Sequence, residues 1–122
     1  MSDREIKNAI IDYAHVEIED HGSLTVSIGL DYGGLHQGFG GYALYLPKSF
    51  SHHRIDMGFA GHFIYRVMAI AEVKRFDELK GKTVRVDCEW GKVHGVGHIV
   101  KDDWFYPDKD FEPFRKKEEK GK

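Results

Sequence analysis

"LTVSIGLDYGGLHQGFGGYAL", residues 24–44, contains two apolar stretches joined by a glycine pair. Leu24, Val26, Ile28 and Leu30 alternate with more polar residues, the period of a strand with one buried face. Gly33 or Gly34 can then adopt the positive φ that a tight turn requires. The segment therefore predicts a β-hairpin whose second strand covers residues 35–46.

That second strand carries an unusual number of glycines around Phe39, namely Gly38, Gly40 and Gly41. Each costs about 0.5–1 kcal/mol relative to alanine in the interior of an element. Either the backbone bends there, or another group approaches it more closely than a side chain would allow. The spacing matches neither a dinucleotide-binding G-x-G-x-x-G nor a Walker loop, so the sequence excludes those nucleotide-enzyme classes.

The flanking segments complete an α+β pattern. Residues 6–20 form a preceding strand, and "EDHGS" supplies the turn before Leu24. Phe59, Phe63 and Val67 recur at helical spacing and predict a helix over about residues 57–74. "RFDELKGK" predicts a short helical turn, and residues 83–100 a second hairpin around Gly91. We therefore expect a mainly antiparallel sheet of about five to six strands, packed by one main α-helix.

Length and charge narrow the possible partners. The chain has 122 residues, which predicts one domain over 1–114, with the charged residues 115–122 as a disordered tail. A net charge of −2 gives no global field for DNA, RNA or an anionic membrane. The single cysteine, Cys88, excludes an internal disulfide and suits a reducing cytoplasm, where we expect it to be a small core residue. No apolar run is typical of an export signal or a membrane span.

No pattern indicates catalytic or metal chemistry. The eight histidines lack the spacing of known metal sites, so we expect neither a metal nor another cofactor. Ser49, Ser51 and His53 lie close together, and Asp102 and Asp103 precede Trp104, but such residues commonly form turns. We assign no catalytic residue and expect a protein that is not an enzyme.

Flat and cationic side chains are the remaining candidates for a binding site. The aromatic residues are Phe39, Tyr42, Trp90, Trp104, Phe105 and Tyr106, and the arginines are Arg54, Arg66 and Arg85. A base stacked on an aromatic ring gains about 1–3 kcal/mol, and arginine is suited to phosphate. The alternative is that Phe39, Phe105 and one tryptophan belong to the core.

Four segments together resemble a phage-encoded family, the first type of Thoeris anti-defence protein. They are "EDHGSLT" (19–25), "DYGGLHQGFGGYAL" (31–44), "KGKTVRV" (80–86) and "GHIVKDDWFYP" (97–107). The resemblance implies a non-enzymatic protein that sequesters cyclic ADP-ribose isomers made by bacterial TIR-domain sensors, so that the host effector is not activated. Some members also capture cyclic di- or trinucleotides at a separate site and form dimers, or hexamers as trimers of dimers.

The resemblance also suggests which residues bind. The positions that match are Gly38 to Tyr42, including Gly41, together with Arg85, residues Lys101 to Phe105, and Arg54. We expect Trp104 or Phe105 to stack on adenine, and Arg54 with Arg85 or Lys101 to engage the pyrophosphate. Trp90 is a further candidate, and Arg66, expected to face solvent, would line the centre of an oligomer.

The hypothesis is thus a homo-oligomeric sponge in the cytoplasm of the host bacterium, with pockets shared between subunits. Two alternatives remain open. The protein could be an enzyme that hydrolyses a cyclic nucleotide signal, or an inhibitor that binds a protein of the host defence.

Overall fold

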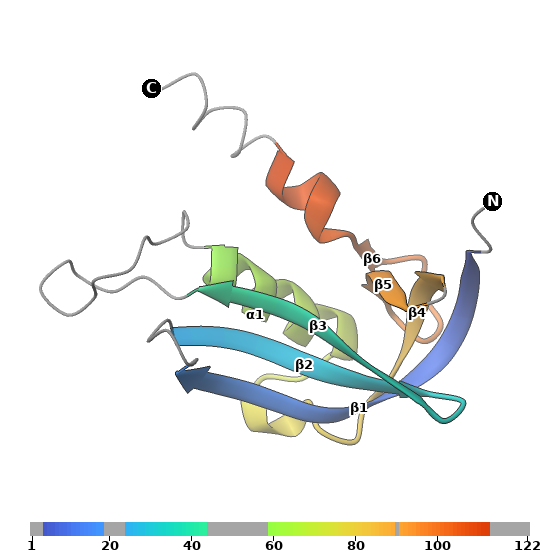
Figure 1. The fold of residues 1–122 in the computed structure, drawn as a ribbon, viewed down its shortest axis with the longest axis horizontal. Coiled ribbons are helices and arrows are strands. Elements are labelled where there is room, and N and C mark those ends of the chain that lie inside the picture. The colour runs from blue at the N-terminus through green and yellow to red at the C-terminus, as the bar shows by residue number, and fades with distance from the viewer. Residues whose placement is uncertain (1–3, 19–23, 44–58, 90, 113–122) are drawn as a thin grey trace, which may run out of the picture.

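The structure, a computed structural model, describes residues 4–18, 24–43, 59–89 and 91–112. Its six strands form one sheet in the order β3-β2-β1-β4-β5-β6, and all neighbouring strands are antiparallel (Figure 1). The strands are β1 (Glu5–Ile18), β2 (Leu24–Tyr32), β3 (Leu35–Ala43), β4 (Thr83–Glu89), β5 (Lys92–Gly97) and β6 (Trp104–Phe105). The helix α1 spans Phe59–Ala71, a 3₁₀ turn η1 spans Phe76–Glu78, and residues 107–112 are helical. The predicted α+β fold is confirmed.

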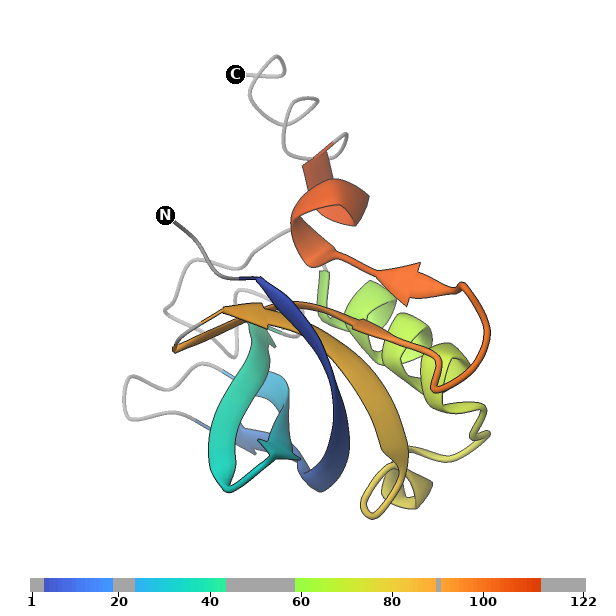
Figure 2. The same cartoon turned by 90° about the vertical axis from the view of Figure 1, so that its right-hand side faces the viewer.

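The sheet is curled into a half-barrel, and α1 lies across its open side (Figure 2). The helix contacts both edge strands, β3 and β6, as well as β2, β4 and β5. Its inward face consists of the apolar rows predicted from the sequence, with Phe59, Ala60, Phe63 and Val67 all buried. The apolar side chains of the sheet meet this face in one continuous core.

Gly40 and Gly41 form a β-bulge in β3. Ser27 of β2 pairs with Gly40 and Val26 pairs with Tyr42, so Gly41 is an extra residue. The φ angles of Gly40 and Gly41 are +116° and +84°. A Cβ on Gly40 would lie 2.6 Å from Cζ of Phe63. The backbone of β3 therefore bends at Gly40 and Gly41, and the ring of Phe63 from α1 closely approaches it there.

Two glycines of β5 receive aromatic rings from the chain that follows. A Cβ on Gly97 would lie 2.5 Å from Cδ2 of Trp104, so the indole lies directly on the bare backbone. Gly97 pairs with Arg85 of β4, whose guanidinium carbon lies 5.0 Å from the centre of a Trp104 ring. This row of three residues attaches β6 to the sheet.

A second row repeats the arrangement. Tyr106 lies on Gly95, where a Cβ would be 2.6 Å from its Cδ1. Its hydroxyl donates to Oδ2 of Asp87, the residue of β4 that pairs with Gly95, over 2.6 Å. The rings of Trp104 and Tyr106 are near-parallel neighbours, with centroids 5.9 Å apart.

The structure differs from the expected elements at several places, one of which is the helix of residues 107–112, which the sequence did not predict. β5 ends at Gly97 and not at residue 100, because the amide of His98 donates to the carbonyl of Asp103 and closes a turn. β6, which the sequence did not predict, then pairs with β5 through Val96 and Phe105. α1 ends at Ala71, and the expected start of the helix, the end of the third strand and the charged tail lie outside the described residues.

Gly40→Ala should lower the free energy of unfolding by about 2–3 kcal/mol, because the new Cβ must displace Phe63 at a φ that disfavours side chains. Gly41→Ala is the matched control: its φ is also positive, but nothing lies within 4 Å of the new atom. The control should cost only about 1 kcal/mol. Urea unfolding followed by circular dichroism measures both, and equal losses would contradict a tight contact at Gly40.

Candidate functional site

A hollow of about 280 Å³ opens between β3 and the turn that joins β4 to β5. One wall is the glycine-rich part of β3, residues 37–40 with Tyr42, where the backbone is within reach of a guest. The other wall is formed by residues 91–94, Pro107 and Asp108. Lys92 and His94 thus face the glycine segment across the hollow.

A second hollow of about 290 Å³ adjoins the first, because His94 and Asp108 line both. Its other lining residues are Arg4, Asp87, Tyr106 and Lys109. The two hollows together are called the cleft below. The ammonium of Lys109 lies 4.9 Å from the centre of the Tyr106 ring, and Trp104 continues the aromatic surface beyond it.

The cleft differs in charge from the larger hollow of about 390 Å³ on the sheet. That hollow is lined by Asn8, Ala9, Ile10, Asp31, Gly33 and Thr83, a set with no basic side chain. The cleft has three basic side chains on its walls, Arg4, Lys92 and Lys109, and two acidic ones, Asp87 and Asp108. An anionic guest is therefore better matched to the cleft.

Asp87 holds part of the cleft wall in place. Arg4 donates to both of its carboxylate oxygens, over 3.0 and 2.7 Å, and Tyr106 donates to one of them. The hydrogen bonds from Arg4 lower the pKa of Asp87, with a smaller contribution from Tyr106. Burial, followed by the hydrogen bond to Asp87, raises the pKa of Tyr106 to about 12.

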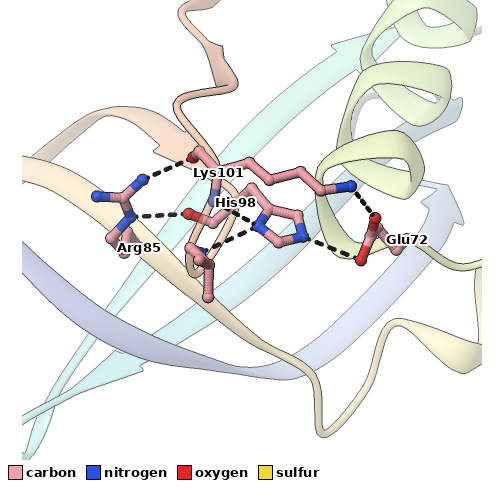
Figure 3. Close-up of polar contacts among 5 residues, drawn as sticks. Glu72, Arg85, His98 and Lys101 are labelled. Atoms are coloured by element: carbon pink, nitrogen blue, oxygen red, sulfur yellow. Dashed lines mark hydrogen bonds and ion pairs between the residues drawn. The ribbon is translucent and has the colours of Figure 1, made fainter.

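Of the residues predicted to bind, Arg85 on β4 lies next to Trp104 on β6, and Lys101 belongs to the turn that joins β5 to β6. Arg85 donates to the carbonyl oxygens of His98 and Lys101, over 2.7 and 2.8 Å (Figure 3). Lys101 donates from Nζ to Oε2 of Glu72 over 2.8 Å. Arg85 and Lys101, both expected to engage phosphate, thus already have partners within the chain.

His98 has both ring nitrogens engaged. Nδ1 accepts the backbone N–H groups of Val100 and Lys101, so the proton is on Nε2, which lies 2.9 Å from Oε1 of Glu72. A histidine with no free nitrogen is not placed to act as a general base. This carboxylate–histidine pair is therefore structural.

Glu72, which the sequence reading left out of the site, connects these groups. It follows the last residue of α1 and has a φ of +57°, a position where glycine is usual. The contacts with Lys101 and then His98 lower the pKa of Glu72 to about 2. No local motif marks this role, because both partners come from a turn distant in sequence.

The aromatic candidates divide between core and cleft. Phe39 and Phe105 are 6% and 0% exposed and pack edge to face, so both are core residues. This corrects the expectation that the Phe105 ring is available for stacking. Tyr42 is half-buried at the cleft, and Gly41 is exposed at the bulge.

Arg66 does not present a free guanidinium to solvent. It donates to the carbonyl of Trp104 over 2.6 Å, and its Nε lies 3.4 Å from Oδ2 of Asp110. Its side chain is only 22% exposed. Arg66 ties α1 to β6 and the last helical turn, which corrects the expectation of a solvent-facing arginine.

Several other candidate residues lie outside the described part of the chain, and the remaining ones do not form a binding site. Arg54, Trp90 and the loop with Ser49, Ser51 and His53 lie outside the described residues. Cys88 is 3% exposed and is the core residue expected. Among the residues with described positions, no group of three or more His, Cys, Asp or Glu could hold a metal ion. Lys92, His94 and Lys109 were also not identified as site residues from the sequence, because isolated lysines and histidines carry no distinguishing pattern.

An absorbance titration should resolve one tyrosine with a pKa of about 12, and Tyr106→Phe should remove it. The pKa of Tyr106 in the folded protein exceeds the ordinary tyrosine value of 10.0, so the Tyr106 contact stabilises the fold fully below pH 10. This contribution is lost as the pH rises from 10 to about 12, where the unfolded chain ionises first. If every tyrosine of the folded protein titrates near 10, the contact between Tyr106 and Asp87 is wrong.

No helix in the described part of the chain is long and apolar enough to span a membrane. No protein-family model matches the sequence, and neither a curated protein nor a solved structure matches it. An inference of function therefore depends on the geometry of the cleft and on the motifs that form it.

Proposed function

We propose that this protein binds a TIR-generated cyclic ADP-ribose isomer in the cytoplasm of an infected bacterium and sequesters it without cleaving it. The host Thoeris effector would then not be activated. The observation that carries the proposal is that residues 37–40 with Tyr42 and Tyr106–Pro107 line one cleft. Both segments belong to the motifs that resemble the anti-defence family, although they are far apart in the sequence.

The surface suits a guest with flat bases and a charged linker. Trp104 and Tyr106 form a continuous aromatic surface at the edge of the cleft, and a stacked base gains about 1–3 kcal/mol. Lys92 and Lys109 supply positive charge for a pyrophosphate. In this proposal Arg85 and Lys101 act mainly by shaping the turn beside Trp104, because both already have partners.

The affinity expected for the guest and the small size of the cleft favour a site shared by two copies of the chain. A guest of roughly 35 non-hydrogen atoms at about −0.3 kcal/mol per atom reaches about −10 kcal/mol, or tens of nanomolar. Ligand pockets usually enclose about 300–1,000 Å³, and the two hollows of the cleft, of about 280 and 290 Å³, lie side by side on the surface of one copy. A second copy would therefore complete the enclosure, in a dimer or a hexamer of three dimers. A separate site for cyclic di- or trinucleotides belongs to the same proposal.

One feature favours hydrolysis as a second candidate function. His94 lines both parts of the cleft, and its Nε2 lies 2.5 Å from Oε1 of Glu89. A histidine oriented by a carboxylate is a common general base. Hydrolysis would open the cyclic guest, whereas sequestration returns it unchanged.

Calorimetry with the purified product of a TIR domain tests the proposal. We expect a dissociation constant of tens of nanomolar for the native chain. Lys92→Ala should weaken binding by about tenfold, since it removes a charge that faces the guest. Lys80→Ala is the matched control: Lys80 is exposed near η1, away from the cleft, and its loss should change nothing.

Chromatography and mass spectrometry of the guest, recovered after heat denaturation of the complex, distinguish the alternatives. An unchanged guest supports sequestration, and an opened ring supports a hydrolase. No heat on titration, together with a host protein that copurifies with the chain, would instead indicate an inhibitor that acts by binding protein.

A further inference from the structure

We infer that Glu72 is a positioning residue: it holds the turn of residues 98–103 and, through that turn, the ring of Trp104. The inference rests on the proposed function, in which Trp104 offers a stacking surface for a base. Glu72 itself lies at the end of α1, on the side of the turn opposite to Arg85 (Figure 3).

The backbone of Glu72 gives the first support. Its N–H donates to the carbonyl of Ala69 over 3.2 Å, and the N–H of Val73 donates to that of Met68 over 3.0 Å. These are the two bonds of a Schellman motif, in which glycine is the usual residue at the left-handed position. Glu72 has a φ of +57° there, a conformation that is unfavourable for a residue with a Cβ. Residues held in unfavourable backbone conformations cluster at functional sites, and this favours a role for the carboxylate of Glu72.

The carboxylate contacts the turn at two points. Oε2 accepts from Nζ of Lys101 over 2.8 Å, and Oε1 lies 2.9 Å from Nε2 of His98. His98 is 8% exposed, and its other nitrogen accepts the amides of Val100 and Lys101. Glu72 therefore fixes a buried side chain around which the turn is hydrogen-bonded.

Arg85 connects the turn to the indole of Trp104. Arg85 donates to the carbonyls of His98 and Lys101, and its guanidinium lies over Trp104. Trp104 follows the turn directly. The backbone carbonyl of Trp104 accepts a hydrogen bond from Arg66. A displaced turn would therefore shift both the cation and the ring.

The competing interpretation is that Glu72 only neutralises Lys101. Exposed ion pairs of this kind contribute little. Removal of the carboxylate would then leave Trp104 in place and strengthen the attraction of an anionic guest for Lys101. The two interpretations thus predict opposite changes in affinity.

Two variants separate them. Glu72→Gln keeps an oxygen for the Nε2–H of His98 but removes the charge, whereas Glu72→Gly removes both contacts and suits the left-handed φ. The matched control is Glu17→Gln, which removes one negative charge from an exposed position on β1. Acrylamide quenching is measured in a Trp90→Phe background, where Trp104 is the one remaining tryptophan of the two. Affinity for the TIR product is measured in the otherwise native chain.

We expect quenching of Trp104 to increase from the parent to Glu72→Gln and further to Glu72→Gly. Affinity should fall by about tenfold in Glu72→Gly, and the control should match its parent in both measurements. Unchanged quenching, or an affinity that rises, would overturn the inference. Circular dichroism checks folding, and Glu72→Gln carries the test if the glycine variant does not fold.

The two failures are distinguishable. If the native chain gives no heat with the TIR product, the proposed function fails, while the quenching series still measures whether Glu72 positions Trp104. If the native chain binds and both Glu72 variants bind equally well, only the positioning role is wrong.

Discussion

The contact between the Phe63 ring and the bare backbone of Gly40 is the constraint on which the remaining structure depends. A Cβ at Gly40 would overlap the ring of Phe63. With the ring seated there, the helix contacts both edges of the curled sheet, and β3 approaches β5. The cleft lies between these two strands, so its glycine wall follows from the way the core is packed.

The same principle acts on the outer face, where aromatic rings occupy the space left by missing side chains. Trp104 covers Gly97 and Tyr106 covers Gly95, and each ring reaches a charged residue of β4. These contacts attach a strand of only two residues to the sheet. They also form a flat surface beside the cleft, so the features that stabilise the sheet's end are also those proposed to receive a base.

The elements with local signals could be predicted from the sequence, and the long-range contacts could not. Alternation and turn glycines identified the hairpins, and the spacing of Phe59, Phe63 and Val67 identified α1. β6 was missed because two residues have no measurable period. Phe39 and Phe105 remained ambiguous, since an aromatic residue beside glycines fits both a core and a stacking site. Arg85 bonds to carbonyls of the turn after β5, and Lys101 of the same turn bonds to the carboxylate of Glu72. No local sequence pattern predicts the conformation of this turn.

The bulge in β3 has a consequence for how copies of the chain can meet. A sheet grows by adding strands to an exposed edge, and here the two edges are β3 and β6. The first is kinked at Gly40 and Gly41, and the second has only two residues, so neither gives a long straight row of free amides and carbonyls to an incoming chain. Association of two copies at β3 or β6 would consequently proceed through side-chain surfaces and not through added strands.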